Sequence, residues 1–256
     1  MLRKCVLCFV LRAVNHGLTV HAQEPAFMEA ATHPGRGTFY TRVLTSYAAY
    51  DVNGTSVDDY RLMSKSAYGL HPRLAFLFDA EARRMASDAS NDTCLDHFTV
   101  RLKYRYLQFD LSPINTIRAS ATVGVIMPGD RKLNPNRNLS PRVGTAITAI
   151  LGRHGLNAQV DRKFLSDTSD TTELNVSHLY RIAPARYTRD TKGAWYTMLE
   201  SLNTFSDDGD YQLDLAAGIL YEARSWAAEV ALRLPVSEKG SRELDREVII
   251  GYRHLF

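Results

Sequence analysis

The chain has 256 residues, of which 45% are hydrophobic and 23% charged, with 31 basic and 28 acidic side chains. This size suits one large all-β domain or two small ones. No run of eighteen apolar residues is present, which excludes a membrane-spanning helix. A membrane protein with this sequence must therefore be a closed barrel, because only closure satisfies every backbone group in lipid.

Residues 1–22 have the features of a secretory signal peptide. Arg3 and Lys4 precede a short apolar run at residues 5–11, and a small-residue cleavage site follows before Gln23. Polar residues interrupt the apolar region, which leaves the true translation start open. A disordered or helical extension is the alternative interpretation.

The leader carries three basic residues and no acidic one, so the remaining chain has 28 of each. A balanced mature chain gives no support for a nucleic-acid partner, which would require a basic patch. Two of the three cysteines also lie in the leader, and only Cys94 remains. We therefore predict no intramolecular disulfide, no metal site and no cofactor.

Residues 23–36 form a short polar lead, which we expect to be a flexible periplasmic segment. The alternative is a small plug that enters a barrel lumen. Extended segments rich in aromatic and β-branched residues then follow one another, as strands do. The predicted strands are 37–50, 59–70, 73–85, 95–109, 115–126, 142–153, 156–165, 173–183, 194–205, 210–222, 225–234 and 243–256. Each could cross a bilayer when tilted, which takes about 9–11 residues.

The connections between these segments alternate in length. Residues 71–72 and 154–155 are short links, whereas 86–94 and 128–141 are long and rich in turn-forming residues. Short turns on one rim and long loops on the other are typical of outer-membrane barrels. The link at 184–192 breaks the rule, because it is long where a short turn is expected.

The strands have two different faces. Near the end of the chain, Val248, Ile250 and Tyr252 alternate with Ile249, Gly251 and Arg253. A soluble sandwich would also alternate, with its apolar row inside. The signal peptide, the loop lengths and the aromatic residues that cap the apolar rows favour a membrane barrel, whose apolar row faces outward to lipid. We predict a closed antiparallel up-and-down transmembrane β-barrel of about 12 strands, at residues 37–256.

In such a barrel the charged rows face the lumen, because a charge at the bilayer midplane costs about 2–4 kcal/mol. The predicted pore-lining residues are Arg42, Arg61, Lys65, Asp79, Glu81, Arg101, Lys103, Arg105, Arg118, Glu200, Asp214, Glu222, Glu229, Arg233, Glu247 and Arg253. They favour a narrow channel with a basic and an acidic wall. In the alternative, Arg101 and Lys103 pair with Asp79 and Glu81, and the lumen is a plugged structural network.

The whole chain from Glu24 to Phe256 resembles small bacterial outer-membrane barrels of about a dozen strands. It is most similar to the transporter family labelled for the MetA pathway of phenol degradation. That resemblance implies passive uptake of small hydrophobic or aromatic solutes, without naming ligand residues. The final strand ends on Phe256 after Tyr252, which resembles the outer-membrane assembly signal. It implies the outer membrane as location, with lipid and the barrel-assembly machinery as partners.

Outer-membrane phospholipases of twelve strands use a Ser/His/Asn arrangement. Here Ser177 and His178 are sequence neighbours, so a strand would direct them to opposite faces, where they cannot act as nucleophile and base. We therefore predict a structural role for His178 and no enzymatic activity. A lipid hydrolase remains the least favoured alternative.

Overall fold

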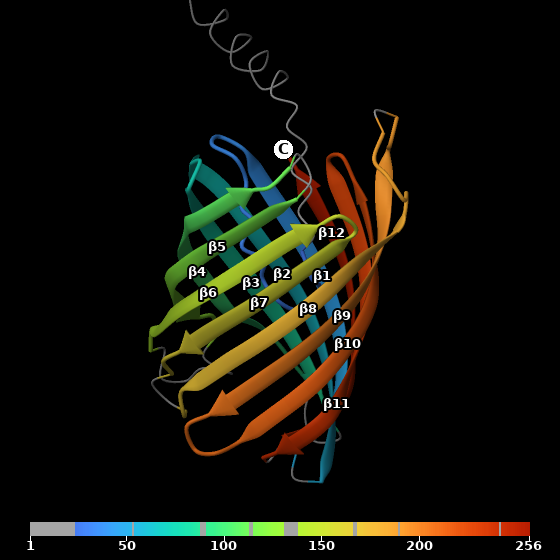
Figure 1. Cartoon of the computed structure of the whole chain (residues 1–256). Helices are drawn as coiled ribbons and strands as arrows, with labels where there is room; N and C mark the ends of the chain where they lie inside the picture. The colour runs from blue at the N-terminus through green and yellow to red at the C-terminus, as the bar shows by residue number, and fades with distance from the viewer. Residues whose placement is uncertain are drawn as a thin grey trace, which may run out of the picture.

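The computed structural model describes residues 24–52, 54–87, 91–112, 115–130, 138–165, 168–188, 190–240 and 242–256. The predicted signal peptide lies outside these residues. Twelve antiparallel strands form one closed barrel in which each strand pairs with its sequence neighbours and β1 pairs with β12 (Figure 1). Among the described residues, no helix is long and apolar enough to cross a membrane. The predicted all-β, closed up-and-down architecture is confirmed.

Each predicted strand overlaps one observed strand. The strands are β1 (Phe39–Val52), β2 (Thr55–His71), β3 (Leu74–Ala86), β4 (Asn91–Asp110), β5 (Thr116–Pro128), β6 (Ser140–Leu151), β7 (His154–Lys163), β8 (Thr171–Ala183), β9 (Gly193–Ser206), β10 (Tyr211–Ala223), β11 (Trp226–Lys239) and β12 (Arg242–Leu255). The largest differences are at the starts of β2 and β4 and at the end of β11, where polar residues continue the pairing beyond the apolar segment.

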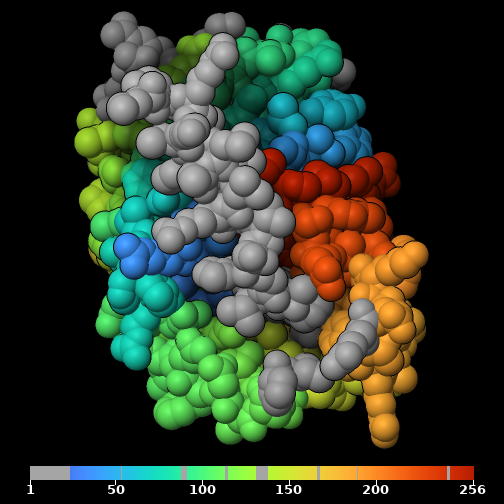
Figure 2. Space-filling view, turned by 90° about the horizontal axis from the view of Figure 1, so that it is seen from above, coloured from blue at the N-terminus to red at the C-terminus, as the bar shows by residue number. Residues whose placement is uncertain are grey.

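The connections sort onto two rims. The links β2–β3, β6–β7 and β10–β11 are tight turns on the rim where β1 begins and β12 ends, which is at the top of Figure 1. We call this the turn rim and the opposite end the loop rim. The β8–β9 link is long although it lies on the turn rim, and its orange residues project at one edge in Figure 2.

The outer surface is apolar and the interior is charged. Tyr104, Leu215 and Val230 are 48%, 52% and 47% exposed, whereas Asp214 is fully buried and Arg101 is 5% exposed. A soluble barrel would have the opposite arrangement. The exposed apolar rows therefore form the surface that faces lipid.

We call residues 24–36 the N-terminal plug; residues 24–34 lie inside the barrel, and the segment ends at the exposed Arg36. The expected flexible tail is therefore wrong for these residues, because the polar interior supplies donors and acceptors for the backbone of the segment. The plug enters past Gly69, where an added Cβ would lie 1.9 Å from the backbone oxygen of Gly35. Only glycine permits this close approach.

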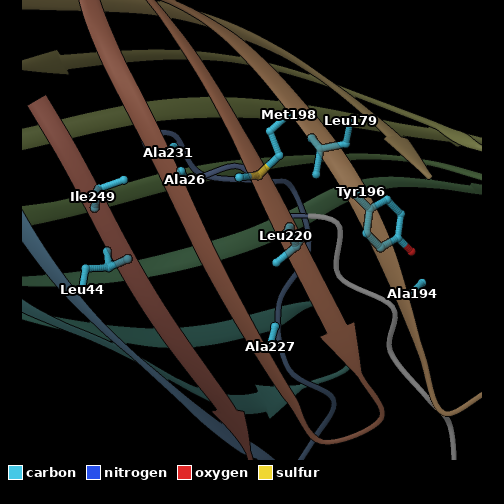
Figure 3. Close-up of a cluster of buried hydrophobic side chains, with 10 residues drawn as sticks. All are labelled: Ala26, Leu44, Leu179, Ala194, Tyr196, Met198, Leu220, Ala227, Ala231 and Ile249. Atoms are coloured by element: carbon cyan, nitrogen blue, oxygen red, sulfur yellow. The ribbon is translucent and has the colours of Figure 1, made fainter. Parts of the chain in front are cut away.

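One side of the interior is apolar. Ala26 of the plug packs among buried residues of the barrel wall that include Leu44, Met198 and Ile249 (Figure 3). Phe27 packs against the same cluster. The apolar contact between plug and wall is small, because the plug contributes Ala26 to the buried cluster and packs only the partly buried Phe27 against it.

Candidate functional site in the barrel interior

Every residue predicted to line a pore lies on the inward-facing row of its strand. The register shows this directly, since Arg42 pairs with Lys65, which pairs with Asp79. All are buried or partly buried. The interior therefore brings the predicted residues together, and the plug lies between them.

Glu200 on β9 holds the start of the plug. Its Oε1 accepts a 2.7 Å hydrogen bond from the backbone N–H of Ala26, and its Oε2 accepts one of 3.2 Å from Phe27. The Glu200 side chain is buried, with the residue 3% exposed. This carboxylate therefore serves the plug backbone, as a carboxylate at a helix N-cap serves free N–H groups.

Glu29 holds the middle of the plug. Its carboxylate forms ion pairs with Arg101 and with Lys103 Nζ, the latter at 2.7 Å. Lys103 also donates to the backbone oxygens of Ala30 and Thr32, at 2.5 and 2.8 Å. Burial alone would raise the pKa of Glu29, but the two cations outweigh it and hold that pKa well below its usual range.

Further plug contacts come from β1 and β12, the two paired strands that close the barrel. Arg42 on β1 donates to the backbone oxygen of Pro25 at 2.7 Å and forms an ion pair with Glu229 at 2.7 Å. Arg253 on β12 forms an ion pair with Glu24 at 2.5 Å. These contacts join the plug to the seam where β1 closes on β12.

A relay of neutral polar groups reaches the plug from β6, β7 and β8. The backbone N–H of Ala31 donates to Thr148 Oγ1 at 2.8 Å, and Thr148 donates to Asn157 at 2.6 Å. Asn157 in turn donates to Ser177 Oγ at 3.1 Å. Ser177 is therefore buried inside the barrel, while His178 faces outward and stacks on His154, as the alternation predicts.

Other interior ion pairs differ from the predicted pairing. Arg101 contacts Asp79 at 2.7 Å, as the plugged alternative proposed, but Lys103 contacts the plug and not Glu81. Glu81 instead lies 3.8 Å from Arg61. Further pairs join Arg83 to Asp59, Arg142 to Asp161, and Arg233 to Asp214 and Glu247. The interior therefore does not have the expected separate basic and acidic walls. Its charges of opposite sign alternate in one network of ion pairs.

One cluster of potential metal-ligating side chains was not predicted from the sequence. Glu81, Asp96 and His97 offer potential metal-ligand atoms within 4.8 Å of one another. A β-bulge opposite Glu81 and Ala82 places the adjacent residues Asp96 and His97 together, which strict alternation cannot anticipate. Arg61 already neutralises part of the charge of Glu81.

The plug separates two cavities. The larger, of about 270 Å³, is lined by charged residues of the wall and by Glu29 of the plug. The smaller, of about 50 Å³, lies at the turn rim beside His33 and Arg253. Glu24 of the plug and Tyr40 of β1 line both, and are therefore the side chains that the two spaces share.

His33 of the plug lies among cations. Its Nδ1 lies 2.9 Å from the backbone oxygen of Pro34, so this nitrogen carries the proton of the neutral ring. Burial, together with the nearby cations Arg105, Lys103 and Arg118, lowers the pKa of His33 from 6.5 to about 4, although the contact with Pro34 opposes the change. His33 is thus neutral at pH 7.

No family model and no curated protein sequence matches the chain. Among solved structures, an outer-membrane channel from Pseudomonas putida F1 is similar, with a TM-score of 0.64 and 14% identity over 92% of this chain and 100% of that chain. LpxR from Salmonella typhimurium has a TM-score of 0.52 and 10% identity over 86% and 100% of the two chains. The β domain of the Bordetella autotransporter BrkA has a TM-score of 0.50 and 10% identity, over 85% of this chain and 99% of that chain.

Because the sequence identities are only 10–14%, these structural similarities establish the fold of the chain alone. The closed barrel, its apolar outer surface and its charged interior define an outer-membrane β-barrel protein of bacteria. Within this class, the fold is similar to that of an outer-membrane channel. The narrower resemblance to the MetA-pathway family stays a prediction.

Proposed function

We propose that the protein is a narrow passive channel for small solutes and that the N-terminal plug gates it. The observation that carries this proposal is the polar cavity of about 270 Å³ inside the closed barrel, which ends at the plug. Charged groups of both signs line it, so water and small solutes can occupy it without desolvating an apolar wall. The predicted pore-lining residues would form the pathway on either side of the plug.

The plug contacts are of a kind that water can replace. Plug backbone N–H groups donate to Glu200, Gln159 and Thr148, plug carbonyls accept from Lys103 and Arg42, and Glu24 and Glu29 form ion pairs with the wall. Each hydrogen bond contributes only about 0.5–1.5 kcal/mol net, or about 1.5–3 kcal/mol where the wall group is charged, because released groups bond to water instead. A segment held in this way can leave the wall without unfolding the barrel.

The resemblance to the MetA-pathway family favours small hydrophobic or aromatic solutes as cargo. The apolar cluster beside Ala26 and Phe27 would supply contacts for such solutes. Lipid would surround the exposed apolar rows, and the assembly machinery would recognise β12 through its outward residues Ile250 and Tyr252.

A planar-bilayer recording tests the proposal. The wild-type barrel should conduct in brief openings, and a variant that lacks residues 24–36 should conduct steadily and at a higher level. Heat-modifiable gel mobility establishes that both proteins are folded. If neither folded protein conducts, the channel proposal is wrong.

The second candidate is a plugged structural barrel. The many buried ion pairs, such as Arg42 with Glu229 and Arg101 with Asp79, favour it because they fill the interior with matched charges. In that case, deletion of the plug would lower the thermal stability of the barrel and produce no conductance.

A further inference from the structure

One buried guanidinium in the interior has no counter-ion among the described residues. Arg181, on the inward face of β8, is 3% exposed. Its Nε and Nη1 have no hydrogen-bond partner in the described part of the chain. By contrast, Arg42 and Arg101 each contact a carboxylate. Because a buried charge without compensation is costly, Arg181 indicates a missing anionic partner.

Tyr187 covers this guanidinium. It belongs to the long β8–β9 link, and its ring centre lies 4.0 Å from the guanidinium carbon of Arg181. The Tyr187 hydroxyl also forms a hydrogen bond with the hydroxyl of Tyr196. Stacking compensates part of the charge but leaves the N–H groups of Arg181 without acceptors. The unusual length of the link is what allows Tyr187 to reach inside the turn rim.

The surroundings of Arg181 are apolar. Arg181 pairs with Tyr196, and Tyr196 pairs with Leu220, so these side chains share one inner wall. Tyr196, Leu179 and Leu220 are fully buried, and Tyr187 packs against their cluster (Figure 3). A cationic end beside an apolar wall matches a molecule with an anionic end and an apolar body.

We propose that the position now filled by the Tyr187 ring is a binding site for a small carboxylate with an apolar body, and that Tyr187 is a lid that the ligand displaces. The carboxylate accepts a hydrogen bond from Nε or from Nη1 in the plane of the guanidinium, and Nη2, which lies between them, completes a two-oxygen fork with either one. The apolar body replaces the Tyr187 ring against Leu179 and Leu220. The site deepens the proposed channel function by naming a solute class, and only its role in transport rests on that function.

A carboxylate fits better than a phosphate. Arg181 offers a single positive charge, and its neighbours in the cluster are apolar. A doubly charged phosphate would lose its hydration without a second cation to replace it. The ligand therefore carries one charge.

Ligand-observed saturation-transfer NMR on the folded barrel in detergent tests the site, with hexanoate as the probe and empty micelles as the reference. 1-Hexanol is the neutral probe of equal chain length. The matched control is Arg73→Met, because Arg73 is an exposed arginine in the β2–β3 turn on the same rim. Arg181→Lys keeps the charge, and gel mobility establishes that each variant folds.

Wild type and Arg73→Met should bind hexanoate equally. Arg181→Met should bind it at least about tenfold more weakly, which is the usual worth of a hydrogen bond to a charged group. Arg181→Lys should recover part of the affinity, and Tyr187→Ala should bind hexanoate more tightly. Equal binding by folded Arg181→Met, binding of 1-hexanol as tight as that of hexanoate, or weaker binding by Tyr187→Ala would overturn the proposal. Because no transport is measured, a barrel that binds hexanoate but does not conduct would reject only the channel function.

Discussion

The carboxylate of Glu200 accepts a 2.7 Å hydrogen bond from the backbone N–H of Ala26, although the two residues are 174 positions apart. This contact joins the middle of β9 to the start of the plug. It also places a buried carboxylate opposite two N–H groups, with Phe27 as the second donor. Glu200 therefore holds this end of the plug together with Arg42 and Arg253.

Glu200→Ala should release the plug more often. Loss of two hydrogen bonds to a carboxylate weakens docking, and the ratio of open to closed time should rise by at least about tenfold, since one hydrogen bond to a charged group contributes about 1.5–3 kcal/mol. Single-channel recording measures the open fraction directly. Asp245→Asn, at a residue whose side chain is 67% exposed, serves as the control and should leave it unchanged. An unchanged open fraction in folded Glu200→Ala would show that this contact does not hold the plug.

Gly69 should tolerate no side chain. An added Cβ would lie 1.9 Å from the backbone oxygen of Gly35, so Gly69→Ala must displace the plug where it enters the lumen. Gly35→Ala is the matched control at the same contact, because its Cβ would meet only Thr38 Oγ1, at 3.7 Å. Limited proteolysis should cleave the plug faster in Gly69→Ala than in Gly35→Ala. Equal cleavage would contradict the close approach.

Plug docking should weaken in acid through His33. The docked plug holds the pKa of His33 near 4, whereas a released plug has the usual value of 6.5, so protonation favours release. Docking should be complete above pH 6.5 and should weaken as the pH falls toward 4. Open fractions recorded between these values should therefore increase in wild type. In His33→Asn the increase should be smaller and limited to the lower end of the interval, because only Glu29, whose pKa the docked plug holds below its usual range, then favours release. A pH response equal to that of wild type in this variant would show that His33 does not control docking.

Arg101→Glu should change ion selectivity. The substitution places a third negative charge beside Asp79 and Glu29, both of which contact Arg101 now. The reversal potential in a salt gradient should shift toward cation preference. Arg84→Glu is the control, because Arg84 is exposed at the loop rim. A reversal potential equal to that of wild type would mean that Arg101 does not line the conducting path.

The sequence predicted the barrel because its strands repeat with a period of two. Tyr104 and Leu215 lie on the outer surface, and Arg101 and Asp214 inside, as that period requires. The place of the plug could not be predicted in this way. Residues 24–36 have no such period, and their partners are far along the chain, as Ala31 and Thr148 show with a separation of 117 positions.

Two further features depend on three-dimensional neighbours. Lys103 contacts Glu29 rather than a wall residue, so its pairing could be found only once the plug was placed. The reach of Tyr187 to Arg181 follows from the path of the β8–β9 link, whose unexpected length was the only signal in the sequence.

A reversible disulfide between plug and wall tests the central claim most directly. The Ala31 N–H donates to Thr148 Oγ1 at 2.8 Å, so these two residues are in contact, and Ala31→Cys with Thr148→Cys is the pair to oxidise, with thiol titration to establish that the disulfide has formed. The single variants cannot form this bond and serve as controls. The account predicts that the oxidised double variant is closed in planar-bilayer recordings and that dithiothreitol restores wild-type openings. Wild-type conductance in the fully oxidised protein would contradict a gating plug.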